Sequence, residues 1–578
     1  MKKKLKTIII IFLALAMILA GGYFGLQKIR EKNRMARIPE TPSRTEGYLK
    51  AEEGKVQLYT REVTIQEDFF GRIASREAVF TAAGEVPRGT AVTLLRDPET
   101  DENGNVLYER FIIEEKEYFA EPGHFTEDKN EVISEKTMYV RTPVTLYKAC
   151  DDYRIAGFAP KGSSLDIKGF DRINDDGCVN MYEVSFNGTE GYVFAKYLAF
   201  TEEEALALYN EHGEADFHKG AVASYETYGG DPLLLDYYPY EKPVSENKEL
   251  LRKGGAMYLC VGCSDEYQAY LDCALSLGIN AVCIDIFDDI LGFDSEAAQE
   301  YSPSNYNYSN WNRAFYAENW AAMVKAFQDA GIYTIGRIVV FKDVNYSYDH
   351  PENCIDYYGT NWPSVYSRGV WEYKVALGIE AVRRFGFDEI QFDYVRFPED
   401  VFYMQTSGVA DFRNTYGETK SQGIQNFLYY ACDMIHREGA YVSVDVFGSS
   451  ASGVVTENGQ YWPAISNIVD VISGMPYTDH FDSYDSSYWT DPYGTLFWWG
   501  GLAAPLQASI PTPAVARTWI TGYNTPCWDP YVYYGANEID LQAQGLKDAG
   551  LDGGFLIWNG GSDLQKYYDI GWAWKSYE

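Results

Sequence analysis

From Gly254 to the C-terminus, short apolar runs alternate with longer segments whose apolar residues recur at helical spacing. Eight of the short runs fit buried strands, at residues 256–262, 280–286, 333–341, 389–395, 440–447, 470–476, 516–522 and 554–558. Helices are predicted between them at residues 266–277, 320–330, 370–385, 423–437 and 538–549, and they end beside Gly278, Gly331, Gly386, Gly439 and Gly550. This repeated order is typical of a parallel sheet, and eight strands favour a (β/α)8 TIM-type barrel, an α/β fold, over an open sheet.

Residues 45–200 lack the helical period and show short alternating runs between turn residues. We predict two small all-β domains there, at residues 45–134 and 135–200. In the first, residues 92–95 and 108–113 are expected to be strands, with DPETDENGN as the hairpin loop between them. Residues 201–253 are interpreted as a connection to the large domain, residues 254–578. It opens with a short helix at Thr201–His212, and the rest is expected to pack along the large domain.

Residues 1–44 have the pattern of an N-terminal signal anchor followed by a short tether. Four lysines in the first six residues precede an apolar run from Thr7 to Leu26, and a run of that length can cross a bilayer as a helix. We therefore predict a single-pass protein of the cell membrane with its body outside the cell. The alternative is secretion after signal cleavage, because the small residues Ala14, Ala16, Ala20 and Gly21 lie within the apolar run.

Charge and composition exclude some classes of partner and leave others open. The net charge of −35 argues against nucleic acid or an anionic membrane surface as a ligand. Aromatic residues make up 16% of the chain, and such rings can stack on sugar faces.

Several kinds of catalytic centre have no sequence support. No G-x-G-x-x-G follows the first barrel strand and the chain contains no G-x-S-x-G, so we predict neither a nucleotide cofactor nor a serine nucleophile. The large domain has only three histidines and no H-x-H, so no metal site is predicted. Cys260 and Cys263 form a C-x-x-C inside the apolar run MYLCVGC and are interpreted as core residues, while Cys150 and Cys178 lie in one small domain and could pair.

The stretch RRFGFDEIQFDYVRFP carries the clearest chemical signal of the chain. It reads as a helix end, a glycine stop and a strand that finishes in Asp393 and Arg396. In an α/β barrel the carboxyl ends of all strands meet at one mouth, where catalytic residues are kept. The ends of the other strands add Asp285, Arg337, Asp445, Tyr477, His480, Trp519, Trp558 and Asn559. Acids and aromatic rings at one mouth are typical of a carbohydrate cleft.

We therefore predict glycoside hydrolysis by two carboxylates. Asp393 is expected to be the nucleophile or the base, kept ionised by Arg337 or Arg396. Asp445 is expected to be the acid, and Asp285 is the reserve candidate for either role. The residues predicted to bind the sugar are Arg337, Arg396, Tyr477, His480, Trp519, Trp558 and Asn559.

The large domain resembles a bacterial family of predicted glycosyl hydrolases with a (β/α)8 barrel. The matching stretches are GINAVCIDIFDD, GIYTIGRIVVFKD, VWEYKVALGIEAVRRFGFDEIQFDYVRFP, VSVDVFG, NIVDVISGMPYTDH and GLDGGFLIWN. The pattern from Val184 to Val193, with Gly188, Gly191 and Tyr192, resembles bacterial Src-homology-3-like domains, and residues 45–134 are interpreted as a diverged copy. These resemblances imply a glycosidase acting on a polysaccharide or peptidoglycan glycan. They also imply that the small domains that precede it in the chain bind the cell wall or act as a spacer.

Two other functions fit the same residues. In one, the barrel keeps its cleft without turnover, and the protein is a non-catalytic carbohydrate- or cell-wall-binding surface protein. In the other, the small β domains attach the protein to the cell wall and the barrel is structural. Turnover that depends on Asp393 separates the enzyme from both.

Overall fold

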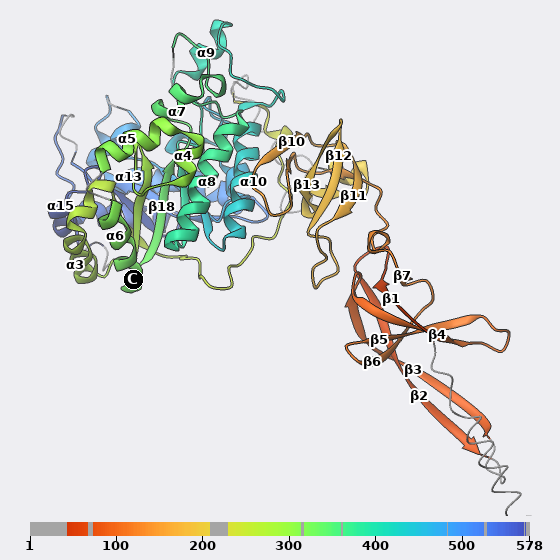
Figure 1. The fold of residues 1–578 in the computed structure, drawn as a ribbon. Coiled ribbons are helices and arrows are strands. Elements are labelled where there is room, and N and C mark those ends of the chain that lie inside the picture. Colours follow the sequence, from red (N-terminus) through yellow and green to blue (C-terminus); the bar gives the residue numbers. More distant parts are fainter. Residues whose placement is uncertain are drawn as a thin grey trace, which may run out of the picture. The chain divides into compact units, whose positions relative to one another are not determined.

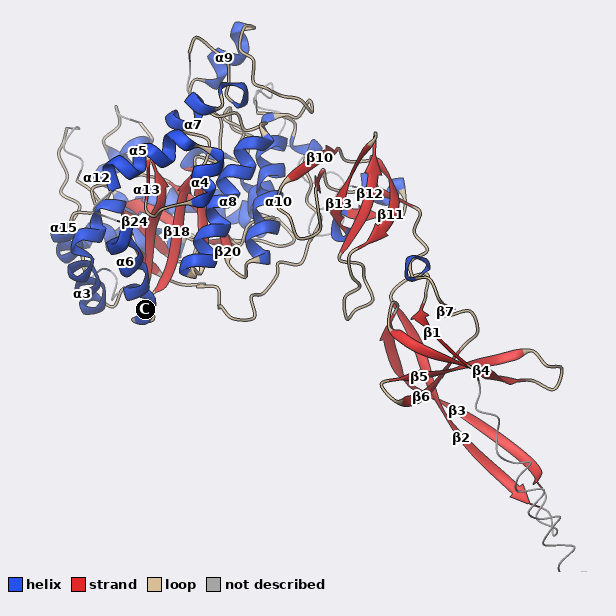
Figure 2. Ribbon diagram, in the orientation of Figure 1, coloured by secondary structure: helices blue, strands red, loops and turns tan. Residues whose placement is uncertain are grey.

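The computed structural model describes residues 43–67, 73–207, 229–313, 317–359, 362–482, 484–524, 529–571 and 573 (Figures 1 and 2). The described residues divide into two compact units, one from the ranges 43–136 and 169–182 and the other from the ranges 137–168 and 183–573. The predicted membrane span, residues 7–26, lies outside the described residues. Within those ranges, no helix combines the length and the apolar character that a membrane crossing requires.

The first β region is one antiparallel sheet with the strand order β3-β2-β6-β5-β4-β1-β7. Its strands are β1 (Arg44–Leu49), β2 (Lys55–Glu67), β3 (Ile73–Pro87), β4 (Ala91–Thr100), β5 (Val106–Ile113), β6 (Lys116–Ala120) and β7 (Phe125–Thr126). The two strands predicted here are confirmed. However, β4 runs into the segment predicted as loop, because Glu99 and Thr100 still pair with Tyr108 and Val106 across the ladder.

The second β region has the strand order β10-β9-β13-β12-β11-β8-β14. Its strands are β8 (Thr137–Val140), β9 (Val144–Tyr147), β10 (Ile155–Ala159), β11 (Ser164–Phe170), β12 (Met181–Phe186), β13 (Thr189–Phe194) and β14 (Leu198–Ala199). Asn187 and Gly188 connect β12 and β13 with φ values of 49° and 82°, the left-handed conformation that tight hairpin turns need. An all-β region is confirmed, and its likeness to Src-homology-3 domains stays a prediction.

The connection to the barrel begins as predicted and then departs from the prediction. Helix α2 (Glu202–Leu206) is capped by the side chain of Thr201, but the backbone leaves the helical conformation at Ala207. The remainder of the predicted helix lies outside the described residues. From residue 229 onward the chain packs on the barrel: Lys242 donates to the carbonyl oxygens of Ser466 at 2.9 Å and Val469 at 2.6 Å. This confirms the expected packing for the part that is described.

The large domain is a nearly closed parallel barrel, consistent with the predicted TIM type. Its strands are β15 (Gly255–Leu259), β16 (Ala281–Asp288), β18 (Tyr333–Val339), β19 (Glu389–Asp393), β20 (Tyr441–Phe447), β21 (Val471–Met475), β22 (Val515–Ala516), β23 (Thr518–Thr521) and β24 (Phe555–Trp558), with the short β17 (Ile290–Leu291) antiparallel to β16. The order is β22-β21-β20-β19-β18-β16-β15-β24-β23. Because only Arg517 separates β22 from β23, the two form one interrupted strand that brings the edges of the sheet together.

The five predicted helices are present, as α3 (Tyr267–Leu277), α6 (Ala317–Asp329), α8 (Arg368–Phe385), α10 (Lys420–Arg437) and α14 (Ala536–Asp548). Figure 1 shows α3, α6, α8 and α10 on the outside of the strands. The glycines that follow the five predicted helices have φ values from 73° to 95°, which explains why each helix ends there. Helices that the sequence did not indicate are α4 (Glu296–Tyr301), α5 (Pro303–Arg313), α7 (Val344–Asp349), α9 (Val401–Ser407), α11 (Trp462–Ser466), α12 (Ser487–Thr490), α13 (Pro492–Ala508) and α15 (Leu564–Ile570).

The barrel interior is polar at the end opposite the predicted site. Arg517 donates to both carboxylate oxygens of Glu389, at 2.9 and 3.0 Å, and the hydroxyl of Tyr333 donates to the same carboxylate at 3.0 Å. The guanidinium and the carboxylate are both fully buried, so each compensates the charge of the other. This pair fills the amino-terminal end of the barrel and leaves the carboxyl-terminal end for the site.

Candidate active site

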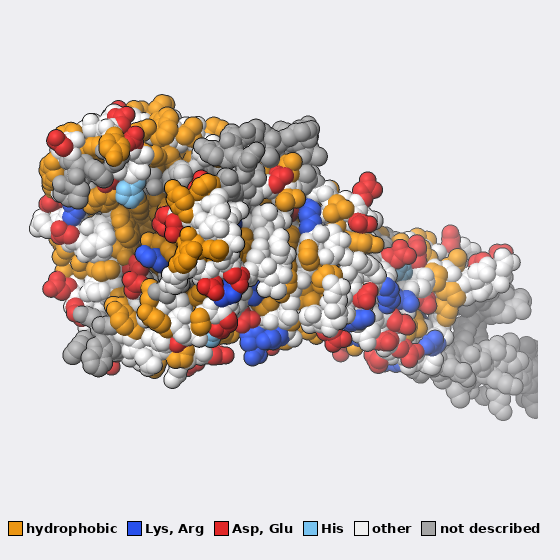
Figure 3. All heavy atoms as spheres, turned by 90° about the horizontal axis from the view of Figure 1, so that it is seen from above, with side chains coloured by type: hydrophobic (Ala, Val, Ile, Leu, Met, Phe, Trp, Pro, Cys, Tyr) orange, Lys and Arg blue, Asp and Glu red, His pale blue; other side chains and the backbone are white. Residues whose placement is uncertain are grey.

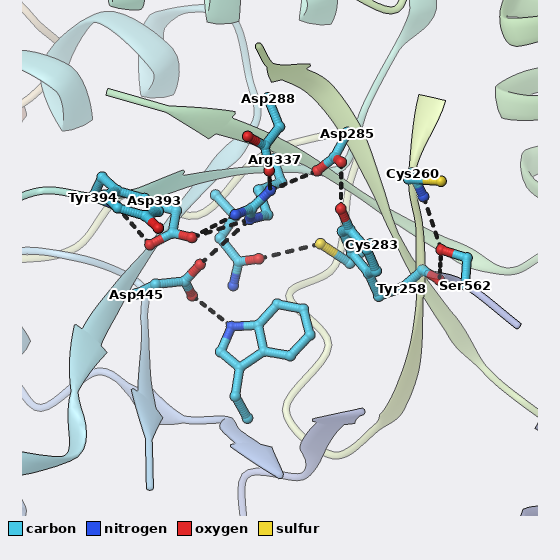
Figure 4. A network of polar contacts seen from close by, with 12 residues as sticks. Tyr258, Cys260, Cys283, Asp285, Asp288, Arg337, Asp393, Tyr394, Asp445 and Ser562 are labelled. Carbon is cyan, nitrogen blue, oxygen red and sulfur yellow. Dashed lines mark hydrogen bonds and ion pairs between the residues drawn. The ribbon is translucent and has the colours of Figure 1, made fainter. Parts of the chain in front are cut away.

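One arginine, Arg337 on β18, gathers the acidic residues of the barrel mouth (Figure 4). Its Nη1 donates to Asp285 Oδ1 at 2.8 Å and to Asp288 Oδ2 at 3.0 Å. Its Nη2 and Nε donate to Asp393 Oδ2 at 2.6 and 3.2 Å. The strand register explains this, because Arg337 is the direct neighbour of Asp285 on β16 and lies two residues before Val339, which pairs with Asp393. A single buried cation therefore holds three carboxylates.

Asp393 is fixed by donors on both of its oxygens. Oδ2 takes the Arg337 hydrogen bonds, and Oδ1 accepts from the backbone N–H of Tyr394 at 2.6 Å. Tyr394 itself has a φ of 55°, a conformation that a bulky side chain adopts only when the surroundings enforce it. Such strain costs about 1–3 kcal/mol and is found at functional sites. The chain thus holds Asp393 at the strand end with its oxygens as acceptors.

Asp445, at the end region of β20, has a different environment. Its side chain is 1% exposed, and Oδ1 accepts from the indole N–H of Trp519 at 2.7 Å. Oδ2 has no hydrogen-bond partner among the described residues and lies 4.0 Å from Nε of Arg337. Burial raises the pKa of Asp445 well above its ordinary value, and the carboxylate of Asp393 raises it further. Asp445 is therefore suited to keep a proton that Oδ2 can donate.

The two carboxyl groups lie close enough to act on one bond. Nε of Arg337 is 3.2 Å from Oδ2 of Asp393 and 4.0 Å from Oδ2 of Asp445. These oxygens are therefore no more than about 7 Å apart, a limit that admits retaining pairs at about 5–5.5 Å and the shortest inverting pairs at about 6.5 Å.

Asp285, the reserve candidate, lies behind Arg337. Its Oδ1 accepts from Arg337 and its Oδ2 from the hydroxyl of Tyr258. Burial raises the pKa of Asp285 to about 7, although Arg337 opposes the rise. Both oxygens are engaged and Asp285 is not among the residues that line the mouth cavity. This placement favours Asp393 and Asp445 as the reacting pair.

Asp285 should also make stability depend on pH. Its pKa rises from 3.8 to about 7 on folding, so the folded state binds more protons between these values. The free energy of unfolding should therefore fall as the pH is raised from about 4 through about 7. Asp285→Asn should flatten that part of the curve, as measured by denaturant unfolding at a series of pH values. An unchanged slope in the variant would show that Asp285 does not carry this proton.

A cavity of about 420 Å³ opens at the mouth, and Figure 3 shows a hollow at this end bordered by hydrophobic, acidic and basic side chains. Its lining is Asp288, Arg337, Lys342, Asp393, Tyr394, Arg396, Glu399, Asp445, Phe447, Met475, Tyr477, His480, Trp519 and Trp558. Eight of the ten predicted site residues are in this wall. The exceptions are Asp285 and Asn559, whose amide donates to the carbonyl oxygen of Asp563 at 3.0 Å and closes the loop after β24.

Aromatic rings form one wall of the cavity. The rings of Trp519 and Trp558 meet edge to face at 5.6 Å, and that of Tyr477 lies 6.4 Å from Trp558. Trp519 and Tyr477 are buried, whereas Trp558 is half-buried and His480 is 64% exposed. Trp558 and His480 are therefore the members of this wall that can meet a sugar directly.

Of the two arginines predicted to keep Asp393 ionised, Arg337 contacts it, whereas Arg396 lines the cavity and its guanidinium has other partners. Its guanidinium donates to Glu399 at 2.6 Å and to the carbonyl oxygen of Phe397 at 3.0 Å, and it lies 4.3 Å from the ring centre of Phe447. The reason is that Arg396 follows the end of β19, where the chain has already turned away from the strand. Glu399 was missed by the sequence reasoning, although its spacing of three residues from Arg396 was an available signal.

A second cavity, of about 610 Å³, adjoins the first and shares Glu399 and Phe447 with it. Its other lining residues are Gly229, Ser449, Ser452, Val454, Val455, Thr456, Glu457 and Asn458. The mouth thus has room beside the carboxylates for further parts of a ligand. Among the described residues, no group of three or more His, Cys, Asp or Glu is arranged to hold a metal ion.

The large domain is similar to one protein family and to several solved structures. A profile of the family described as "Putative glycosyl hydrolase domain" matches residues 257–564. No curated protein matches the chain. Similar solved structures include a hypothetical protein from Ruminiclostridium thermocellum, which is 29% identical over 35% of this chain and 100% of its own, with a TM-score of 0.27. Another is the glycoside hydrolase domain of PgaB (BpsB) from Bordetella bronchiseptica, which is 10% identical over 55% of this chain and 98% of its own, with a TM-score of 0.39. A class V chitinase from Pseudomonas fluorescens is 10% identical over 56% of this chain and 99% of its own, with a TM-score of 0.37.

Proposed function

The chain belongs to the family described as "Putative glycosyl hydrolase domain", and from this premise we propose that Asp393 and Asp445 together hydrolyse a glycosidic bond. The observation that supports this most directly is the contrast between the two carboxyl groups. Asp393 receives hydrogen bonds from Arg337 and a backbone N–H, whereas burial raises the pKa of Asp445 and its Oδ2 accepts no hydrogen bond from the described residues. Two carboxyl groups whose environments differ in this way are suited to act as base or nucleophile and as acid.

Asp445 Oδ2 gives its proton to the glycosidic oxygen while the bond between that oxygen and the anomeric carbon breaks. In an inverting reaction, Asp393 takes a proton from the water that attacks the anomeric carbon. In a retaining reaction, Asp393 attacks the anomeric carbon itself, and Asp445 then takes a proton from the water that releases the sugar from Asp393. Arg337 orients Asp393, and the half-buried Trp558 in the cavity wall is the ring on which the sugar would pack.

A full-length preparation tests the proposal against bacterial exopolysaccharides and peptidoglycan, with new reducing ends as the readout. We expect release from at least one polymer. Binding to a polymer without release would instead support the non-catalytic carbohydrate-binding protein, and neither binding nor release from any of them would contradict the proposal.

We also propose that the substrate is a cell-wall or exopolysaccharide glycan and that the body lies outside the cell. The apolar run at residues 7–26 behind four lysines supports a membrane anchor, and the two adjoining cavities support a polymeric ligand. The predicted Src-homology-3-like domains would then contact the wall. Protease added to intact cells should remove the body, and only detergent should extract the intact chain. Protection from protease would contradict this placement, whereas a soluble protein in the medium would favour signal cleavage.

The pH profile should respond to the indole that contacts Asp445. The Trp519 N–H lowers the pKa of Asp445, so Trp519→Phe should raise that pKa and move the alkaline limb of kcat/KM to higher pH. Trp499→Phe is a matched control, because Trp499 is equally buried but donates to the carbonyl oxygen of Gly448. An alkaline limb that stays in place in the Trp519 variant would mean that Asp445 is not the acid.

A further inference from the structure

A pair of cysteines lies in a turn directly after β15. Cys260 follows the strand, and Cys263 lies in the 3-10 segment η5 (Val261–Glu266). The Cys263 N–H donates to the carbonyl oxygen of Cys260 at 3.0 Å and closes the turn, while the two sulfur atoms are 3.6 Å apart. Both thiols are free. The first and fourth residues of such a turn have Cα atoms within about 7 Å, close to the range that a disulfide bridges.

The two thiols have unequal surroundings. Cys263 is 5% exposed, whereas Cys260 is half-buried. The thiol of Cys263 donates a hydrogen bond that lowers the pKa of Cys260 to about 6. By contrast, burial raises the pKa of Cys273 to about 11 and that of Cys354 to about 12. The interpretation of both cysteines as core residues therefore holds fully for Cys263, whereas Cys260 is half-buried against the barrel core.

The pair is joined to the candidate active site through hydrogen bonds. The backbone N–H of Cys260 donates to Oγ of Ser562 at 3.1 Å, and that hydroxyl donates to the carbonyl oxygen of Tyr258 at 3.1 Å (Figure 4). The hydroxyl of Tyr258 in turn contacts Asp285. The turn is therefore linked by hydrogen bonds to a carboxylate that Arg337 holds at the barrel mouth.

We propose that Cys260 and Cys263 are an oxidisable dithiol that closes to an intrachain disulfide by exchange with a low-molecular-weight disulfide. The Cys260 thiolate attacks one sulfur of that disulfide, which breaks its S–S bond and releases the first thiolate. The Cys263 thiol then loses its proton and attacks the Cys260 sulfur. The second thiolate leaves and takes up that proton. The dithiol is thereby oxidised by two electrons, the small disulfide is reduced to two thiols, and the exchange does not depend on the glycosidase activity.

The test is peptide mass spectrometry of the full chain equilibrated with oxidised and reduced glutathione, alkylated, and cleaved by chymotrypsin. Cleavage after Tyr258 and Tyr267 isolates both cysteines without any other cysteine of the chain. We expect this fragment to lose two hydrogen atoms under oxidising conditions and to regain two alkylation sites under reducing conditions. Full alkylation of both thiols under oxidising conditions would overturn the proposal.

Single variants identify the attacking thiol. Cys263→Ser should trap a glutathione adduct on Cys260, and Cys260→Ser should leave Cys263 unmodified because it is buried. Cys273→Ser, on α3, is the matched control and should exchange like the unmodified chain. The alkylation rate of Cys260 should be half-maximal near pH 6, and in Cys263→Ala this midpoint should move upward. An adduct that forms on Cys263 in place of Cys260, or a midpoint that does not move, would contradict the assigned roles.

Discussion

The Asp393→Asn variant is expected to lose between about 10²-fold and 10⁴-fold in kcat on the glycan that the protein cleaves. An amide can neither attack the anomeric carbon nor take a proton from water. Its oxygen can still accept from Arg337, so the fold and the binding of the polymer should be retained. Reducing-end release measures the rate, and polymer binding measured in parallel separates loss of chemistry from loss of affinity.

The matched control for this variant is Asp388→Asn, the same substitution beside the other end of β19. Asp388 accepts from the N–H of Thr334 at 2.8 Å and from its hydroxyl at 2.9 Å, at the barrel end opposite the mouth. Its substitution should leave kcat nearly unchanged. If Asp393→Asn keeps its rate, the chemistry belongs to Asp285 or Asp445, and the assignment to Asp393 is wrong.

Replacing Arg337 with Met should have the largest effect on stability, a loss of about 3–5 kcal/mol at neutral pH. The substitution leaves Asp285 and Asp445 buried without their cation, which normally lowers the pKa of both. In the variant these pKa values rise further. The loss in the free energy of unfolding, relative to the unmodified chain, should therefore be smallest at low pH and should grow as the pH is raised. All 13 tryptophans lie between residues 311 and 574, so tryptophan fluorescence during denaturation reports on the barrel.

Arg396→Met provides the control for this stability measurement. Arg396 is as buried as Arg337, but its ionic partner Glu399 is 64% exposed and keeps its hydration when the arginine is removed. Arg396→Met is therefore expected to lose less stability than Arg337→Met, and its loss should depend little on pH. Equal losses in the two variants at every pH would contradict the view that Arg337 compensates the buried carboxylates.

Local sequence pattern was sufficient to predict the strands of the barrel and five of its helices. Apolar spacing and left-handed glycine stops are properties of a few neighbouring residues, and they hold whatever the rest of the chain does. Helix α13 was missed because its sequence, PYGTLFWWGGLAAPLQA, is apolar on nearly all sides, so it lacks the contrast that marks a helix face. Its interior Pro505 and paired glycines also argue against a helix in isolation.

The site was only partly predictable, for a different reason. Barrel topology alone brings strand ends together, which is why most of the predicted residues line one cavity. The choice between Arg337 and Arg396 depends on register, since Arg337 lies directly opposite Asp285 in the sheet. Likewise, the turn of Asn559 toward Asp563 follows from loop geometry beyond the strand. Neither relation is encoded in the spacing of residues along one segment.

The measurement that tests the central claim most directly is reducing-end release from the cleaved glycan by four proteins: the unmodified chain, Asp393→Asn, Asp445→Asn and the double variant. If the two carboxyl groups act on one bond as a unit, the double variant should be about as slow as the slower single variant. Losses that multiply in the double variant, or a single variant that retains full rate, would contradict the assignment of Asp393 and Asp445 as the catalytic pair.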